Sequence, residues 1–388
     1  MATLGRYALL RITLAFVVCG VLAALYCSSP LVAGIAQEPK VPATNMAETR
    51  AAHTLAVKAP TKQTGAPQRP IAKGFAAQTG VPPPALAASC GVRAGARWLV
   101  AVYWSGLKRR LLLDSTLQRL IAPLVAEGSA VHVYASLLHN DSGVGMWKHV
   151  RKRAREDPAL ASVGAGELGA YLKGRIASTG ACPAYGEVLR RPEDLGSLPE
   201  RPRDLKKYPP WSTQTGKRLL RLWKSRERLW NATQASEVAM RRVYDLLLWV
   251  RDDSMWVAKF PSPSIFLSAP FASRSVWARS CRSFGGINDK VVVMGRSAAA
   301  PMLTLYSTFL AGDVAEPTKN SEEYMKRAAR RAGLVLNYTS FDVLPEASAM
   351  IIGEPRNISV CALRLPWCGG HKLPHDFAGF CEDIAKKG

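Results

Sequence analysis

The sequence has few acidic residues and no internal repeat. Asp and Glu total 29 against 52 Lys and Arg, so the formal net charge is +23. The lack of a repeat at solenoid or propeller periods argues against those architectures. Such a cationic surface favours phosphates, sulfated or uronic polymers and anionic lipid head groups as partners. We expect no nucleic-acid partner, because the features described below indicate a secretory lumen.

Charge is absent from Ile12–Tyr26, which with the preceding apolar residues reaches about the length of a membrane-spanning helix. Arg6 and Arg11 precede this run, so the positive-inside rule places the N-terminus in the cytosol and the body of the chain in the lumen. We expect a cytosolic tail at 1–11 and a transmembrane signal anchor with its flank at 12–36. A cleaved signal peptide is the alternative. A retained anchor gives a single-pass type II protein of the Golgi or endoplasmic reticulum membrane.

Aromatic residues are scarce from 37 to 89, where Ala, Pro, Thr, Lys and Gln dominate. A segment of this composition has too little apolar surface to offset the entropy of ordering, so we expect a disordered stem. Residues 90–388 remain for a lumenal domain. They are enough for one large α/β domain or two closely packed ones.

Asparagine is also scarce, yet four of the seven Asn residues begin an Asn-x-Ser/Thr sequon. Chance predicts about one such sequon at this Ser and Thr content. The excess supports a secretory body with glycans. The candidate glycosylation sites are Asn140, Asn231, Asn337 and Asn357.

Six cysteines lie beyond the anchor, an even number that is compatible with three disulfides in an oxidising lumen. Their pairing does not follow from the sequence. Cys361, Cys368, His371 and His375 are an alternative zinc set, although their spacing is not that of a standard finger. We keep His371 as a candidate ligand of a divalent metal, with a solvated loop histidine as the alternative.

Short apolar runs alternate with helical patterns in the body of the chain. Strands are predicted at 98–104, 130–136, 246–250 and 291–294. Helices are predicted at 111–126, 145–156, 166–178, 216–229, 233–242, 297–311 and 320–331. Asn231 is a candidate N-cap of the helix at 233–242, and Asn320 with Glu323 has capping-box spacing. This alternation predicts an α/β fold with a mostly parallel central sheet flanked by helices.

The stretch Tyr244–Phe260 combines a buried strand with two carboxylates. Leu246–Val250 is apolar at every position, as expected for a central strand covered on both faces. Asp252 and Asp253 follow it, at the end of the strand where open α/β sheets bind ligands. Two such carboxylates suit Mn²⁺ or Mg²⁺ bridging to a substrate diphosphate. An ordinary solvated turn is the alternative, because Asp is common where a chain leaves a strand.

Ser105–Arg110 is a small-residue turn that leads into a helix. Backbone amides at the helix start, with Arg109 and Arg110, can hold a phosphate. The turn matches neither a Walker loop nor a dinucleotide fingerprint, so a solvated helix start is the alternative.

Cys281–Arg296 is the third stretch with candidate site residues. Adjacent glycines allow a tight loop there, and an amide and a carboxylate stand directly before a predicted strand. A carboxylate beside such a loop can act as a general base, and an Asx turn is the alternative. The candidates are Gly285, Gly286 and Asn288 for an acceptor loop, Asp289 as the base and Lys290 as a phosphate contact.

The chain thus carries, in order, an anchor, a Pro-rich stem, WLVAVYWSGLKRR, YDLLLWVRDD and, about thirty residues later, GGINDKVVVMGR. From about residue 95 to 380 this order resembles lumenal glycosyltransferases of the GT-A type, particularly poorly characterised eukaryotic glycosyltransferase-like proteins. The resemblance implies a GT-A-like nucleotide-sugar-binding domain. It also implies that Asp252 and Asp253 hold a divalent metal and the donor diphosphate, and that Asp289 positions or deprotonates the acceptor. Arg251-Asp252-Asp253 departs from the usual Asp-x-Asp pattern.

The resemblance implies a metal-dependent, hexosyltransferase-like enzyme that moves a sugar from a nucleotide-sugar donor to a glycan or protein acceptor. Arg109, Arg110, Arg251, Asp252 and Lys290 are its expected donor-binding residues. Two alternatives stay open. A sulfotransferase would use residues 105–110 as its phosphate cradle, but the chain lacks the Lys-x-Gly-Thr-like pattern there. A non-catalytic lumenal glycan-binding protein or inactive relative would bind glycans without nucleotide sugars.

Overall fold

A computed structural model describes residues 90–139, 162–195, 213–281, 283–312, 320–352 and 359–362, with the single residues 160, 198 and 318. All of them belong to the second of two compact units, Ala76–Gly388. The predicted anchor and stem, the helix at 145–156, Asn140, Asn357 and His371 lie outside the described residues. No helix in the described part of the chain combines the length and the hydropathy needed to cross a membrane.

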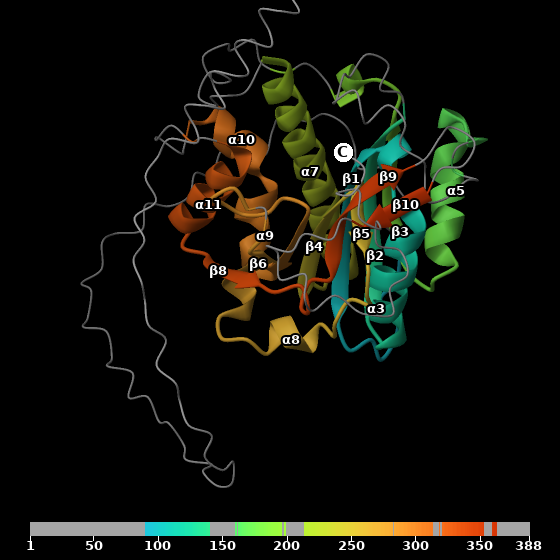
Figure 1. Ribbon diagram of the computed structural model, residues 1–388. Helices are drawn as coiled ribbons and strands as arrows, with labels where there is room; N and C mark the ends of the chain where they lie inside the picture. Colours follow the sequence, from blue (N-terminus) through green and yellow to red (C-terminus); the bar gives the residue numbers. More distant parts are fainter. Residues whose placement is uncertain are drawn as a thin grey trace, which may run out of the picture. The chain divides into compact units, whose positions relative to one another are not determined.

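A seven-stranded sheet with the order β3-β2-β1-β4-β7-β6-β8 forms the centre of the described part (Figure 1). Its strands are β1 (Leu99–Leu107), β2 (Ala130–Leu138), β3 (Cys182–Leu189), β4 (Leu246–Arg251), β6 (Ser275–Arg279), β7 (Val291–Gly295) and β8 (Val335–Thr339). All neighbouring strands are parallel except those that pair with β7, which is antiparallel to β4 and β6. The predicted mostly parallel sheet is therefore confirmed.

A second, three-stranded sheet follows the strand that ends at the paired carboxylates. Its order is β10-β9-β5, with β5 (Ser254–Trp256), β9 (Glu346–Ile352) and β10 (Ser359–Ala362). β5 and β9 are antiparallel, and Trp256 stands opposite Glu346. Because β5 begins directly after Asp253, the small sheet fixes the chain immediately beyond the end of β4.

The helices cover both faces of the main sheet. They are α2 (Leu113–Thr116), the π-helical turn η3 (Leu117–Ile121), α3 (Ala122–Ala126), α5 (Ala165–Ala177), α7 (Thr213–Met240), α8 (Ser264–Leu267), α9 (Arg296–Leu303), α10 (Leu305–Leu310) and α11 (Ser321–Arg331). Short 3-10 turns are η2 (Lys108–Arg110), η5 (Pro192–Leu195) and η6 (Ala272–Arg274). Helices α7, α9, α10 and α11 lie on one side and α3 and α5 on the other (Figure 1). The predicted α/β class with flanking helices is confirmed.

Alternation along the strands explains why the sheet needs cover on both faces. In β1, Ala101 and Tyr103 join the core under α7, while Val100 and Val102 join the core under α3 and α5. Successive side chains of a strand point to opposite faces, so a strand that is apolar at every position is stable only between two helical layers.

Two predicted helix boundaries are wrong. The helices predicted at 216–229 and 233–242 are one helix, α7, which ends at Met240, and Asn231 lies inside it and caps nothing. The buried face of α7 continues through Trp230 and Thr233, so packing holds the helix together across the sequon. The predicted helix at 297–311 is interrupted at Thr304. Pro301, which has no backbone N–H to donate, precedes this break.

The N-cap prediction for α11 is confirmed, because Asn320 Oδ1 accepts a hydrogen bond of 2.8 Å from the Glu323 backbone N–H. A disulfide joins Cys90 to Cys182, so the segment before β1 is tied to the start of β3. Cys281 is also disulfide-bonded. These bonds agree with the expectation that the cysteines form disulfides.

Candidate functional site

The candidate site lies where the strand order of the sheet reverses. From β1 the chain continues to β2 on one side, and β4 is added on the other side. Ser105, near the end of β1, is in register with Ser136 of β2 and with Arg251 of β4. In open α/β sheets the crevice outside the carboxyl ends of such strands is the usual place for a ligand.

Asp252 is held by the end of β1. Its carboxylate accepts two hydrogen bonds from Arg110, Nε to Oδ2 at 2.7 Å and Nη2 to Oδ1 at 2.6 Å, in the forked geometry that arginine favours. The Leu107 backbone N–H also donates to Oδ2 at 2.7 Å. Gly106 makes this approach possible, since a Cβ there would collide with the Asp252 side chain. Asp252 is buried and fixed as the partner of Arg110.

Asp253 is surrounded by three cations. Arg251 donates to both of its carboxylate oxygens at 3.1 Å, Lys290 Nζ lies 2.6 Å from Oδ2, and Arg110 Nη1 lies 3.9 Å away. Burial raises the pKa of Asp253, but Arg251, Lys290 and Arg110 outweigh burial and hold this pKa well below its ordinary value. Asp253 is therefore ionised at neutral pH.

Asp289 approaches the same place from β7. Because β7 is antiparallel to β4, the residues before it lie beside the residues that follow β4. Arg251 Nη1 donates to both oxygens of Asp289, at 2.9 and 3.0 Å, and the indole N–H of Trp249 donates to the Asp289 backbone carbonyl at 2.9 Å. Burial raises the pKa of Asp289, but Arg251, Arg226 and Lys290 together lower this pKa below its ordinary value.

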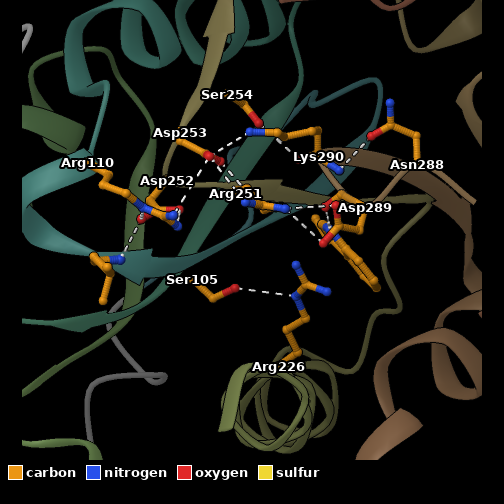
Figure 2. A network of polar contacts seen from close by, with 12 residues as sticks. Ser105, Arg110, Arg226, Arg251, Asp252, Asp253, Ser254, Asn288, Asp289 and Lys290 are labelled. Atoms are coloured by element: carbon orange, nitrogen blue, oxygen red, sulfur yellow. Dashed lines mark hydrogen bonds and ion pairs between the residues drawn. The ribbon is translucent and has the colours of Figure 1, made fainter. Parts of the chain in front are cut away.

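Arg226 enters the site from helix α7, which packs on one face of the sheet. Its guanidinium carbon lies 3.3 Å from the centroid of the Trp249 ring, and its Nε donates to Ser105 Oγ at 3.4 Å. Figure 2 shows this side chain pointing from α7 toward Ser105, below the Arg251–Asp289 pair. The residue is 1% exposed, and Nη1 and Nη2 have no hydrogen-bond partner among the described residues.

These side chains form one charged cluster that contains four cations and three carboxylates. We define the charged cluster as Arg110, Arg226, Arg251, Lys290, Asp252, Asp253 and Asp289. Its formal charge is +1 when all seven groups are ionised. Asp289, Arg251 and Lys290 keep 14%, 19% and 17% of their side-chain surface exposed, whereas Asp252 keeps 1%. A ligand from solvent therefore meets the β7 side of the cluster first.

The donor set does not fit a divalent cation in this arrangement. All four carboxylate oxygens of Asp252 and Asp253 accept hydrogen bonds from Arg110, Arg251 or Lys290. In the part of the chain that the structure describes, no group of three or more His, Cys, Asp or Glu side chains could hold a metal ion. A metal would have to displace cationic side chains from their carboxylates before it could bind.

The structure brings together the predicted residues Arg110, Arg251, Asp252, Asp253, Asp289 and Lys290. Asn288 lies nearby, but its side chain stabilises a turn. Its Oδ1 accepts a hydrogen bond from the Lys290 backbone N–H, as in an Asx turn, and its Nδ2 donates to the Cys281 carbonyl. Gly286 packs so close to the backbone of α11 that a Cβ would collide with Glu322, and Gly285 has a φ of +86°. Arg109 lies in η2 beside Arg110.

Of the described sequons, Asn231 is exposed on α7 and Asn337 is half-buried in β8.

Sequence reasoning missed Arg226, although a signal was present. Arg226 falls on the same face of α7 as Trp223, Trp230 and Thr233, all of them buried. A lone cation on an apolar helical face indicates a buried charge that needs a partner. Glu346 was also missed. Burial raises the pKa of Glu346, and its Oε1 has no hydrogen-bond partner among the described residues.

Comparisons with known proteins give little help. No protein-family model matches the sequence, and no curated protein does. The apo form of the glycosyltransferase GlyE of Streptococcus pneumoniae TIGR4 aligns with a TM-score of 0.31 at 10% identity over 61% of this chain and 44% of that one. The apo structure of the bifunctional glycosyltransferase WbbM aligns with a TM-score of 0.31 at 7% identity over 65% of this chain and 40% of that one. This chain covers less than half of either protein, and at these TM-scores neither likeness assigns it a function.

Proposed function

We propose that this chain is a glycosyltransferase that moves a sugar from a nucleotide-sugar donor to a glycan or protein acceptor in the secretory pathway. One observation carries the proposal: a buried, net cationic cluster with three carboxylates lies at the carboxyl ends of β1 and β4, at the reversal of strand order. A diphosphate is the ligand chemistry that such a cluster favours. The sequence resemblance supports the same activity.

The proposed reaction breaks the bond between the anomeric carbon and a diphosphate oxygen and forms a bond from that carbon to an acceptor hydroxyl oxygen. The electron pair of the broken bond goes to the leaving nucleoside diphosphate, so preorganised cations near its phosphates stabilise the transition state. Arg226, Arg251 and Lys290 are placed to do this. The hydroxyl proton goes to a general base.

Asp289 is our candidate for that base, as an inverting enzyme requires. It is ionised at neutral pH and lies on the more exposed side of the charged cluster. Arg251 orients its carboxylate through two hydrogen bonds. The same pairing lowers the pKa of Asp289, which weakens it as a base but keeps it free of a proton over a wide pH range.

A screen of thermal stabilisation by UDP, GDP and CMP, each with and without Mn²⁺, tests the proposal on the full chain. We expect one nucleotide family to raise the melting temperature, by an amount that grows with the logarithm of its concentration once this exceeds the dissociation constant. Asp289→Asn should keep this stabilisation while turnover of the matching nucleotide sugar falls by on the order of 10². A melting temperature that stays equal to that of the ligand-free chain with each of the three nucleotides at millimolar concentration would contradict the proposal.

We further propose a single-pass type II protein of the Golgi or endoplasmic reticulum membrane, with its body in the lumen. Asn231 supports this, since the sequon is exposed on α7. At least two of the four sequons should carry glycans, so endoglycosidase treatment after expression in a secretory cell should lower the apparent mass. A body that is open to protease in sealed microsomes would contradict this topology.

A non-catalytic glycan-binding protein or inactive relative is the second candidate. One observation favours it: both oxygens of Asp289 are held by Arg251, which leaves the candidate base with little freedom. Binding to immobilised glycans without any stabilisation by nucleotides would support this second candidate against the first.

A further inference from the structure

Arg226 is the one member of the charged cluster that forms no ion pair with a described side chain. Arg110 contacts Asp252, Arg251 contacts Asp253 and Asp289, and Lys290 contacts Asp253. Arg226 instead makes one hydrogen bond of 3.4 Å to an uncharged hydroxyl, that of Ser105. Asp289 and Asp252 attract this guanidinium from a distance, but neither forms an ion pair with it.

Burial makes this arrangement unfavourable without an anion. A buried ion without a partner costs several kcal/mol, and buried donors are almost always satisfied in folded proteins. The stacking on Trp249 contributes a cation–π attraction but no acceptor for the four N–H bonds of Nη1 and Nη2. Burial lowers the pKa of Arg226 to about 9, while Asp289 and Asp252 raise it, so the side chain is still charged at neutral pH.

The free edge of the guanidinium matches a phosphate. Nη1 and Nη2 form a planar fork, and phosphate oxygens accept from such a fork through two parallel hydrogen bonds. Ser105, which holds Nε, lies at the carboxyl end of β1, so the fork lies at the edge of the sheet where the proposed donor binds. None of the three carboxylates is available to the fork, because each already accepts from another cation.

We propose that Arg226 binds a phosphate group of the donor directly, and that this guanidinium, rather than a divalent metal ion held by Asp252 and Asp253, supplies the charge that neutralises the diphosphate. The inference rests on the proposed function and makes it more specific. The two carboxylates then have another role: they hold Arg110, Arg251 and Lys290 in place. The phosphate satisfies the buried Nη1 and Nη2 donors, for which the described residues offer no acceptor.

The test is a calorimetric titration of the full chain with the nucleoside diphosphate that stabilises it, in EDTA and in Mn²⁺, followed by the same titration with pyrophosphate alone. We expect the same affinity with and without metal. Arg226→Met should weaken nucleoside diphosphate binding by about 10-fold to 150-fold, the range for one charge-assisted hydrogen-bonded contact. Arg226→Lys should retain part of the affinity, because it keeps the charge but loses the fork.

Melting temperatures of the ligand-free variants separate a binding role from a structural one. Arg226→Met removes a buried charge that has no ion-pair partner among the described residues and roughly keeps the volume, so it should leave the melting temperature unchanged or raise it. Arg330→Gln is the matched control, since Arg330 is exposed at the end of α11 and its loss removes the same charge. The control should keep the affinity within about twofold, because Arg330 is exposed and salt screens exposed charges.

The outcomes are distinct. Binding that needs Mn²⁺ overturns the inference and leaves the proposed function standing. If Arg226→Met lowers the melting temperature and leaves the affinity unchanged, Arg226 has a purely structural role, and the inference is also overturned. If Arg226→Met does not fold, Arg226→Lys is the decisive variant. An affinity of Arg226→Lys equal to that of the unaltered chain would likewise overturn the inference. No binding of any nucleoside diphosphate in either condition overturns the proposed function, and the inference with it.

Discussion

At the scale of single residues, the Arg110–Asp252 pair joins the first and fourth strands in sequence and is buried on both sides. Removing one partner leaves the other charged and unpaired. Asp252→Asn should therefore lower the free energy of unfolding by about 3–5 kcal/mol, measured by urea denaturation. The double variant Arg110→Met, Asp252→Leu should lose clearly less, because no unpaired charge remains. Equal losses in the single and double variants would contradict this account of the pair.

The buried side chain of His132 should make the free energy of unfolding depend on pH. It lies buried in β2 with Nδ1 2.7 Å from the Tyr244 hydroxyl, and burial lowers its pKa to about 4. The unfolded chain binds this proton near pH 6.5, so the native state is stabilised above that pH and loses stability as the pH falls toward 4. Between pH 7 and 5 this group should account for a loss of about 2 kcal/mol. His132→Asn should reduce the pH dependence by that amount, and an unchanged slope would exclude His132 as its source.

At the scale of elements, the site depends on how closely the end of β1 approaches the end of β4. Gly106 has a φ of +151°, and a Cβ there would overlap the Asp252 side chain. Gly106→Ala should therefore displace Asp252, lower the free energy of unfolding by about 1–3 kcal/mol and weaken nucleotide binding. Gly166→Ala on helix α5 is the control, since a Cβ at this position would have no neighbouring atom within 4 Å. Crystal structures or thermal melts of the two variants would separate overlap at the site from a general effect of alanine.

Much of this element-level arrangement could be predicted from the sequence, but the orientation of β7 could not. The apolar runs of β1, β2 and β4 identify central strands, and parallel strands place Arg110 and Asp252 at one edge. In a wholly parallel sheet the residues before β7 would lie at the opposite edge from the end of β4. Asp289 and Lys290 reach the site because β7 is antiparallel, and strand direction leaves no mark in a five-residue apolar run.

Other parts were missed for different physical reasons. β3 includes Pro183 and Gly186, and the side chains of β8 are exposed or half-buried, so neither has the apolar pattern of a core strand. The ion pairs of the charged cluster join residues up to 142 positions apart, and local sequence patterns carry no information on such contacts. Arg226 could have been found, because it interrupts an apolar helical face.

At the scale of the whole molecule, the Cys90–Cys182 disulfide joins the segment before β1 to the first residue of β3. It closes a loop with a sequence separation of 92 residues, for which chain entropy predicts about 4–5 kcal/mol of stabilisation. Cys90→Ser with Cys182→Ser should lower the free energy of unfolding by up to this amount in denaturant titrations. A change under about 1 kcal/mol would show that the loop is already constrained in the unfolded chain.

The most direct measurement of the central claim is a crystal structure of the chain with the nucleoside diphosphate that stabilises it most. The account predicts phosphate density at the carboxyl ends of β1 and β4, with phosphate oxygens within hydrogen-bonding distance of Arg226 Nη1 and Nη2. It also predicts that Asp252 remains paired with Arg110. Nucleotide bound at another place on the molecule, or phosphates held at a distance from all four cations of the charged cluster, would contradict it.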